Sequence, residues 1–324
     1  MSDTEVSVNR RALKLLQKLM EKPDKFNVTV KQTRKGTTFI DAGIKAEGGF
    51  QAGKKIVEIC LGGYGKAEVC AACYDDMMLP SVFVYTNRPA VSTLGSQFAD
   101  WQIKRDDFSA IGSGPARALV RRNRELYEKI DYKDESEDAV LVLETSSEPP
   151  EPLIEDIAKE CRVLLKRLFL VLVPTSSVAG STQVSGRIVE TGLHKLVKLG
   201  FDPKRASHAY GSAPIAPVHP RFVAAMGRTN DAILYGGSAH YDVKGYSDEE
   251  LEKIVAKAPS SASKSYGRAF KETFRAAGHD FYKIDPNLFA PAVVSVCNLD
   301  TGNSFVAGSV NVGVLKDSFG LKVL

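Results

Sequence analysis

The chain has 324 residues, of which 44% are hydrophobic and 25% charged, and its formal net charge is +4. This is ordinary globular composition, in a length that suits two domains or one large α/β domain. The mild charge, without a recognisable motif, argues against a nucleic-acid partner. No run of 18 apolar residues is present and residues 1–5 are polar, so we expect a cytoplasmic protein without a membrane span or signal peptide.

The first half of the chain predicts a mixture of helices and strands. Residues 7–20 place Leu13, Leu16 and Met20 at three- and four-residue spacing, which is typical of a helix with one buried face. Two short segments on either side of Lys35-Gly36 predict a hairpin. In chain order we expect strands at 27–33, 37–41, 56–61 and 81–86, a helix at 89–101, a strand at 108–111 and a helix from 115 to about 130.

The second half alternates strands with helices, a pattern that favours parallel pairing with right-handed crossovers. Ser247 and Glu250 predict a capping box that opens a helix toward residue 256. The expected elements are strands at 139–144 and 168–173, helices at 151–165 and 182–199, a proline-rich break at 214–220 and a C-terminal hairpin formed by 292–299 and 304–310.

The fold class is therefore α/β with some antiparallel pairing. We place the domain boundary in the charged segment 131–138, which gives an N-terminal domain of residues 1–138 and a C-terminal domain of residues 139–324. The hairpin of residues 292–310 is a candidate to pack back on the first domain.

The cysteines and histidines do not predict a metal centre. Cys70 and Cys73 have metal-ligand spacing, but a structural zinc needs four ligands and no second Cys or His pair lies nearby. A buried, reduced pair is the favoured interpretation. The five cysteines are odd in number and irregularly spaced, which argues against a disulfide framework.

A glycine loop at 112–117 is the first candidate site. Ser113 and Gly114 allow close backbone approach to a ligand, the following helix start offers free N–H groups, and Arg117 could bind a phosphate or carboxylate. A tight turn between strand and helix explains the loop equally well. The basic run that continues through Arg121, Arg122 and Arg124 is either a solvated helix face or the border of an anionic ligand.

Arg187 and Glu190 are the second candidate. Helical spacing makes them neighbours, and such a pair is most often an exposed ion pair that contributes little to stability. Two features favour a catalytic interpretation. The preceding loop is rich in Ser, Thr and Gly, and the pair follows the carboxyl end of the strand at 168–173, where open α/β sheets bind ligands.

The third candidate, 227–237, begins with Arg228, Asn230 and Asp231, which together can bind the edge of a heterocycle. Its other interpretation is a turn before a strand that runs through Tyr235 and is closed by two glycines.

These segments, with four others, resemble the methenyltetrahydromethanopterin cyclohydrolase family nearly end to end. Seven blocks in order carry the resemblance: 59–63, 89–93, 112–119, 183–192, 213–217, 227–237, and 281–286 with 289–291. The resemblance implies two α/β domains with mixed sheets and the substrate pocket between them. It also implies a cytoplasmic homo-oligomer, a trimer, that acts in one-carbon metabolism and methanogenesis.

The implied reaction interconverts 5,10-methenyltetrahydromethanopterin and 5-formyltetrahydromethanopterin, a carrier whose tail bears a phosphate and carboxylates. The resemblance implies Glu190 as the catalytic carboxylate, Arg187 as its partner, and no cofactor or metal beyond the carrier itself. Some members have a lysine where this chain has Phe98. The candidate substrate-binding residues are Ser92, Thr93, Ser113, Gly114, Arg117, Ser176, Ser177, Gln183, Arg228, Asn230, Asp231 and Tyr235.

The residues support this chemistry independently, because an electrophilic methenyl cation needs only a positioned water and a base. Two alternatives are a phosphate-binding sugar or nucleotide enzyme that uses the loop at 112–117, and a pterin-binding protein without turnover.

Overall fold

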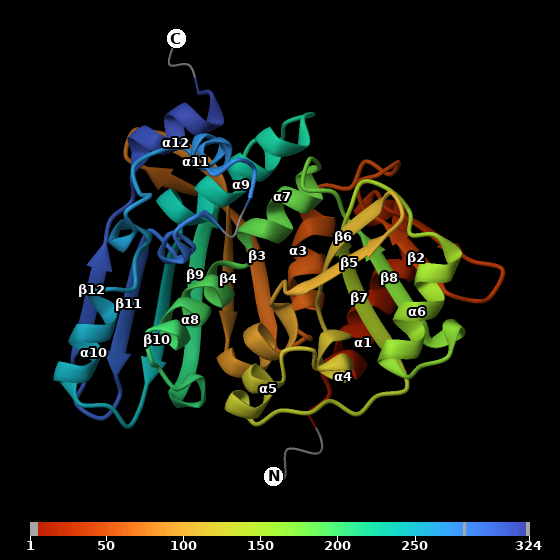
Figure 1. Cartoon of the computed structure of the whole chain (residues 1–324), viewed down its shortest axis with the longest axis horizontal. Helices are drawn as coiled ribbons and strands as arrows, with labels where there is room; N and C mark the ends of the chain where they lie inside the picture. Colours follow the sequence, from red (N-terminus) through yellow and green to blue (C-terminus); the bar gives the residue numbers. More distant parts are fainter. Residues whose placement is uncertain (1–5, 281–282, 322–324) are drawn as a thin grey trace. The chain divides into compact units, whose positions relative to one another are not determined.

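The computed structural model describes residues 6–280 and 283–321, which form two compact units, each containing a six-stranded sheet (Figure 1). The first unit comprises the described residues up to Lys66 together with Ala90–Gln183. The second comprises Ala67–Pro89 and the described residues from Val184 onward. The predicted α/β class with mixed sheets is confirmed.

The sheet of the first unit has the strand order β1-β2-β8-β7-β6-β5. Strands β2, β8 and β7 are parallel, whereas the hairpins β1–β2 and β5–β6 and the β6–β7 pair are antiparallel. The strands are β1 (Thr29–Gln32), β2 (Thr38–Asp41), β5 (Trp101–Arg105), β6 (Phe108–Ser113), β7 (Ala139–Glu144) and β8 (Leu168–Leu172). The helices include α1 (Val8–Glu21), α2 (Pro23–Phe26), α3 (Phe50–Cys60), the π-helix η2 (Ala90–Gln97), α4 (Arg117–Val120), α5 (Arg124–Ile130) and α6 (Glu151–Cys161).

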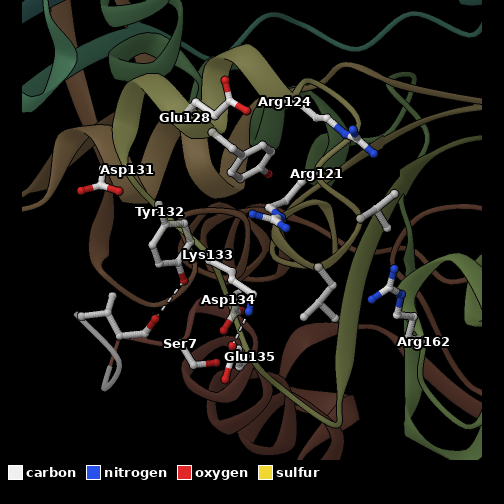
Figure 2. A pocket seen from close by; sticks show the side chains of 14 residues that line it. Ser7, Arg121, Arg124, Glu128, Asp131, Tyr132, Lys133, Asp134, Glu135 and Arg162 are labelled. Atoms are coloured by element: carbon white, nitrogen blue, oxygen red, sulfur yellow. Dashed lines mark hydrogen bonds and ion pairs between the residues drawn. The ribbon is translucent and has the colours of Figure 1, made fainter. Parts of the chain in front are cut away.

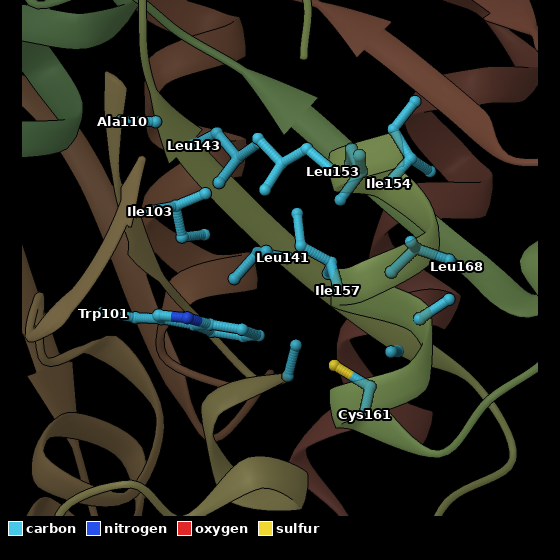
Figure 3. Close-up of a cluster of buried hydrophobic side chains, with 14 of the residues drawn as sticks. Trp101, Ile103, Ala110, Leu141, Leu143, Leu153, Ile154, Ile157, Cys161 and Leu168 are labelled. Atoms are coloured by element: carbon cyan, nitrogen blue, oxygen red, sulfur yellow. The ribbon is translucent and has the colours of Figure 1, made fainter. Parts of the chain in front are cut away.

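Both faces of this sheet are buried, because alternate residues of its central strands point to opposite sides. Leu141 and Leu143 of β7 pack against α6 in one cluster, which Figure 3 shows. Val140 and Val142 of the same strand pack against α1 and α3 in a second cluster. The continuous apolar run of β7 therefore matches a central strand covered on both sides.

The sheet of the second unit has the order β12-β11-β10-β9-β4-β3, in which β10 and β11 are parallel. Helices α9, α11 and α12 share a hydrophobic cluster beside it. The strands are β3 (Gly65–Tyr74), β4 (Met77–Thr86), β9 (Ala206–Pro214), β10 (Ser238–Val243), β11 (Val293–Asn298) and β12 (Ser304–Gly308). The helices are α8 (Ile188–Lys198), α9 (Phe222–Gly236), α10 (Asp248–Val255), α11 (Phe270–Ala276) and α12 (Val312–Phe319); α7 (Val178–Ser185) spans the point where the chain passes between units.

The domain division differs from the expected boundary at residue 138. That position cuts the first unit, because β7 and β8 are central strands of a sheet that also contains β1 and β2. The β11–β12 hairpin pairs with β10 inside the second unit rather than with the first domain. The chain passes between the two units three times, and local composition does not reveal these crossings.

Several predicted elements are confirmed and others are wrong. Ser7 caps α1 through a hydrogen bond from the Arg10 amide (3.1 Å), and the capping box of α10 is present. The strand expected at 56–61 is the end of α3. Residues 56–60 of this helix are all buried, and their largely apolar sequence resembles that of a buried strand. The helix expected from 115 to 130 is divided at Arg121, which adopts the left-handed conformation, and that at 182–199 is divided into α7 and α8.

No helix among residues 6–280 and 283–321 is both long enough and apolar enough to cross a bilayer. The resemblance block at 281–286 lies partly outside the described residues, at Phe281 and Tyr282.

Candidate active site

The Arg187–Glu190 pair is buried at the start of α8. Arg187 is the N-cap residue of this helix, and Glu190 lies in its first turn. Nη1 of Arg187 is 3.6 Å from Oε2 of Glu190, and the two side chains are only 8% and 6% exposed. The interpretation of an exposed ion pair is therefore wrong. Removing either side chain would leave the other as a buried, uncompensated charge, which is strongly destabilising. Both side chains are therefore needed together at this position.

A helix N-terminus and a buried tyrosine lie beside Glu190. The first turn of a helix presents unsatisfied N–H groups and the positive end of the helix dipole to an anion. Tyr241 lies close by and is fully buried; its hydroxyl donates to the Val189 carbonyl at 2.7 Å. Burial and then the charge of Glu190 raise the pKa of Tyr241 well above its usual value, so this hydroxyl stays neutral.

Glycines let α8 approach its sheet closely. A Cβ on Gly192 would lie 2.3 Å from the Tyr241 hydroxyl, and one on Gly237 would lie 2.4 Å from Cδ1 of Ile188. A Cβ on Gly211 of β9 would also meet Ile188, at 3.0 Å. The position of Glu190 thus depends on three sites that have no room for a side chain.

One buried cation on the same helix was missed by sequence reasoning. Lys195 is 2% exposed, and its ammonium donates to Oδ1 of Asn287 at 2.7 Å. Burial lowers its pKa. A lysine in a helical pattern gives no sequence signal of burial, since a lysine on an exposed helix face looks the same.

Two of the resemblance blocks, 59–63 and 112–119, meet within the first unit, and Ser96 of η2 is hydrogen-bonded to both. The Ser96 hydroxyl donates to the Cys60 carbonyl (2.6 Å), the Gly114 amide donates to the Ser96 carbonyl (3.0 Å), and Sγ of Cys60 is 3.8 Å from Oγ of Ser113. Gly114 has a φ of +94°, which favours glycine at this turn. The predicted Ser92 and Thr93 are fully buried in η2, a π-helix, a conformation frequent at functional sites.

Arg117 ties these segments together. Its guanidinium is 3% exposed, forms an ion pair with Asp100, and donates to the carbonyls of Leu94 (3.2 Å) and Ser96 (3.4 Å). It also lies 5.3 Å from the ring centre of Phe98. Arg117 therefore positions η2, and its direct contact with a ligand stays a prediction.

The loop after β8 has the predicted character. The Ser177 hydroxyl donates to the Pro174 carbonyl (2.8 Å) and accepts from the Gly180 amide (3.0 Å), so it caps the start of α7. Ser176 is half-buried in the same turn, and Gln183 is buried near the end of the helix. These residues follow the carboxyl end of β8, as the sequence indicates.

The segment 227–237 is helix α9, not a strand approached by a turn. Arg228 donates to three carbonyls, those of Ser318, Pro217 and Val218, at 3.1–3.3 Å. The other predicted ligands also bind protein groups: Asn230 donates to the Met226 carbonyl, Asp231 accepts from the Phe270 amide and the Ser318 hydroxyl, and Tyr235 donates to the Arg268 carbonyl. These contacts give all four side chains a structural role within the second unit.

A Ser–His–Asp contact on the second sheet is a weaker candidate. His240 is 2.7 Å from the Ser295 hydroxyl and 3.1 Å from Oδ1 of Asp242. Acyl transfer also needs free N–H donors beside the nucleophile. Ser295 lies in β11, which pairs with β10 on one side and β12 on the other, so its backbone amide lies within a paired ladder.

The thiols of Cys70 and Cys73 are exposed on β3, so the interpretation of a buried pair is wrong. Within residues 6–280 and 283–321 no group of three or more His, Cys, Asp or Glu side chains is arranged to hold a metal ion.

The chain is similar to proteins of one family along nearly its whole length. A sequence profile of the family described as Cyclohydrolase (MCH) matches residues 7–319. The chain is 45% identical to the methenyltetrahydromethanopterin cyclohydrolase of Methanobrevibacter smithii over 322 residues, which are 98% of this chain and 99% of that protein. Proteins of the same name from Methanothermobacter thermautotrophicus and Methylobacillus flagellatus are each 44% identical, over 98% and 97% of this chain and 100% and 95% of their own lengths.

Proposed function

Because the chain belongs to the cyclohydrolase family, we propose that it reversibly hydrolyses 5,10-methenyltetrahydromethanopterin to 5-formyltetrahydromethanopterin. The observation that carries this proposal is the buried Arg187–Glu190 pair at the start of α8. It supplies a carboxylate whose ionisation is favoured by a guanidinium and a helix N-terminus, together with a cation that fixes the carboxylate rotamer.

In the proposed first step, Glu190 accepts a proton from a water while the water oxygen bonds to the methenyl carbon. The electrons of the C=N bond move to the cationic nitrogen, and a neutral hydrate forms. The substrate cation is already electrophilic, so the step needs a base and orientation rather than a cofactor. Before attack, the negative charge of Glu190 also stabilises the substrate cation.

The second step opens the ring. The carboxylic acid of Glu190 returns its proton to the aryl nitrogen as the carbon–nitrogen bond breaks. The formyl C=O forms as the hydrate hydroxyl loses its proton to the carboxylate, from which the proton passes to solvent. Arg187 keeps the carboxylate in place while it changes charge.

Glu190→Gln is the decisive variant, because the amide preserves shape but cannot act as a base. We expect turnover to fall by at least about 100-fold, with substrate binding changed by less than about tenfold, since general acid–base groups contribute typically 10²–10⁴-fold. The decrease in methenyl absorbance measures turnover, and equilibrium titration with the methenyl form measures binding.

Glu58→Gln is the matched control. Glu58 is also a buried glutamate (3% exposed) paired with a cation, Lys55, at 2.5 Å. Its variant should lose stability without a comparable fall in turnover. Wild-type activity in Glu190→Gln would remove Glu190 from the mechanism. A wild-type protein that binds the methenyl form but leaves its absorbance unchanged would be a pterin-binding protein rather than an enzyme.

The resemblance alone supports two further proposals, a cytoplasmic location and a trimeric assembly.

A further inference from the structure

The basic run from Arg117 to Arg124 divides into two kinds of arginine. Arg117 pairs with Asp100, and Arg122 makes three hydrogen bonds to Glu160, at 2.6–3.1 Å. Arg121 and Arg124 form no ion pair with a carboxylate of the part of the chain that the structure describes. Half of the run is therefore accounted for by ion pairs, and half is available to a ligand.

Arg121 and Arg124 line a cavity of about 610 Å³ within the first unit (Figure 2). A third arginine, Arg162, joins them from the end of α6, about 40 residues later in the chain, and likewise forms no ion pair with a described carboxylate. Leu119 and Val120 complete this part of the lining. Three guanidinium groups, two from the α4–α5 connection and one from the end of α6, thus border one cavity.

Four carboxylates also line the cavity, and two of them, Asp134 and Glu135, are bound by other described residues. Figure 2 shows Asp131 at the opposite edge of the cavity from Arg162. Glu135 pairs with Lys133 at 2.5 Å, and Asp134 accepts two hydrogen bonds from Asn9. Glu128 is the fourth and, like Asp131, forms no ion pair with a described cation. Asp131 and Arg162 thus lie at opposite edges of the cavity, whereas Glu128 lies one helical turn from Arg124 on α5.

Two of these arginines occupy positions where stability favours glycine. Arg121 ends α4 with a φ of +49°, and Arg162 ends α6 with a φ of +58°. A non-glycine residue in this left-handed conformation costs about 1 kcal/mol. The side chains therefore occupy these positions at a cost to folding.

We propose that Arg121, Arg124 and Arg162 form a binding site for a phosphate group. Guanidinium groups present forked donors that match the oxygens of phosphate, and three of them suit a dianion. The ligand is either inorganic phosphate or the phosphate of a larger molecule whose apolar part contacts Leu119 and Val120. The site is independent of the chemistry proposed for Glu190.

The left-handed backbone permits a test that separates binding from folding. In the double variant Arg121→Gly with Arg162→Gly, two cations are lost while backbone strain is relieved. We expect its Tm in chloride buffer to equal or exceed that of the wild type. Titration of the full-length protein with inorganic phosphate at constant ionic strength should raise the wild-type Tm to a plateau but leave that of the variant unchanged. Calorimetry should show at least a tenfold weaker Kd for phosphate in the variant.

Asn27→Gly is the matched control, because Asn27 ends α2 in the same left-handed conformation (φ +50°) and does not line the cavity. It should keep the full response to phosphate. A wild-type protein without saturable stabilisation by phosphate would overturn the proposal, and so would a double variant that responds like the wild type.

Kinetics then distinguish the two sources of phosphate. If the double variant raises KM only for a carrier with the phosphorylated tail, the cavity holds that tail. If KM is unchanged while phosphate binding is lost, the site serves a separate phosphate ligand. Both results support the site, and neither depends on Glu190 being the base.

Discussion

At the scale of single residues, burial decides what a carboxyl group does. Glu190 and Asp231 are both nearly inaccessible, but Glu190 has a guanidinium 3.6 Å away, whereas the partners of Asp231 among the described residues are the Phe270 amide and the Ser318 hydroxyl. Burial consequently raises the pKa of Asp231 to about 7. A strongly raised pKa is a frequent sign of an active site, but the hydrogen bonds of Asp231 show a structural group.

The raised pKa of Asp231 gives a pH dependence of stability. Between the unfolded value of 3.8 and about 7, the folded protein holds a proton that the unfolded chain has lost, so stability falls as pH rises through this window and levels off above it. Asp231→Asn removes the titration. We expect the difference in free energy of unfolding, variant minus wild type, to increase by up to about 4 kcal/mol between pH 4 and pH 8.

Denaturant unfolding across that pH range measures the effect. Asp76→Asn is the control, because Asp76 is exposed, binds Lys316 and has a lowered pKa, so its titration has the opposite sign. A constant difference between Asp231→Asn and the wild type at all pH values would show that folding does not shift the pKa of Asp231.

At the scale of elements, the contact between α8 and its sheet positions the candidate base. Gly192 of α8 faces the Tyr241 hydroxyl of β10, which is itself held by the Val189 carbonyl. A methyl group at Gly192 cannot be accommodated by moving the end of a flexible side chain, because Tyr241 is fully buried. The start of the helix, and with it Glu190, would have to shift.

We therefore expect Gly192→Ala to lower stability by about 1–3 kcal/mol and to lower kcat more than it raises KM. Thermal unfolding and steady-state kinetics measure the two effects. Gly313→Ala is the control, since Gly313 lies in α12 with only Asn311 Oδ1 within 4 Å of the added carbon, at 3.6 Å. Wild-type kinetics in Gly192→Ala would mean that the helix position does not govern the reaction.

At the scale of the whole molecule, each compact unit is built from two stretches of chain. A cut at the predicted boundary, residue 138, would remove β7 and β8 from the first unit. These strands lie between the hairpins β1–β2 and β5–β6, so the sheet could not form. All three strands from β2 through β8 to β7 are parallel neighbours in the middle of this sheet.

A fragment of residues 1–138 should therefore remain unfolded, since it lacks two buried central strands. A polypeptide that joins residues 1–66 to residues 90–183 through a flexible linker should instead show cooperative unfolding by circular dichroism, because it contains the complete first unit. A cooperatively folded 1–138 fragment would contradict this division of the chain.

The sequence by itself determined the features that depend on near neighbours. These include the apolar strands β7 and β8, the hairpins β1–β2 and β11–β12, the capping box of α10 and the adjacency of Arg187 and Glu190. Periodicity, turn residues and helical spacing act over a few residues, so they can be read locally. The family resemblance was also visible, because seven blocks in order are specific where each alone is not.

Only the tertiary structure decided which polar side chains are buried and what they bind. An i, i+3 pair looks the same on any helix, and the burial of Glu190 depends on Tyr241, some 50 residues away. The same holds for Arg117, which binds Asp100, and for Arg121, which lines a cavity completed by Arg162. Burial and charge neutralisation are set by contacts between distant segments, and the spacing of residues along the chain does not specify them.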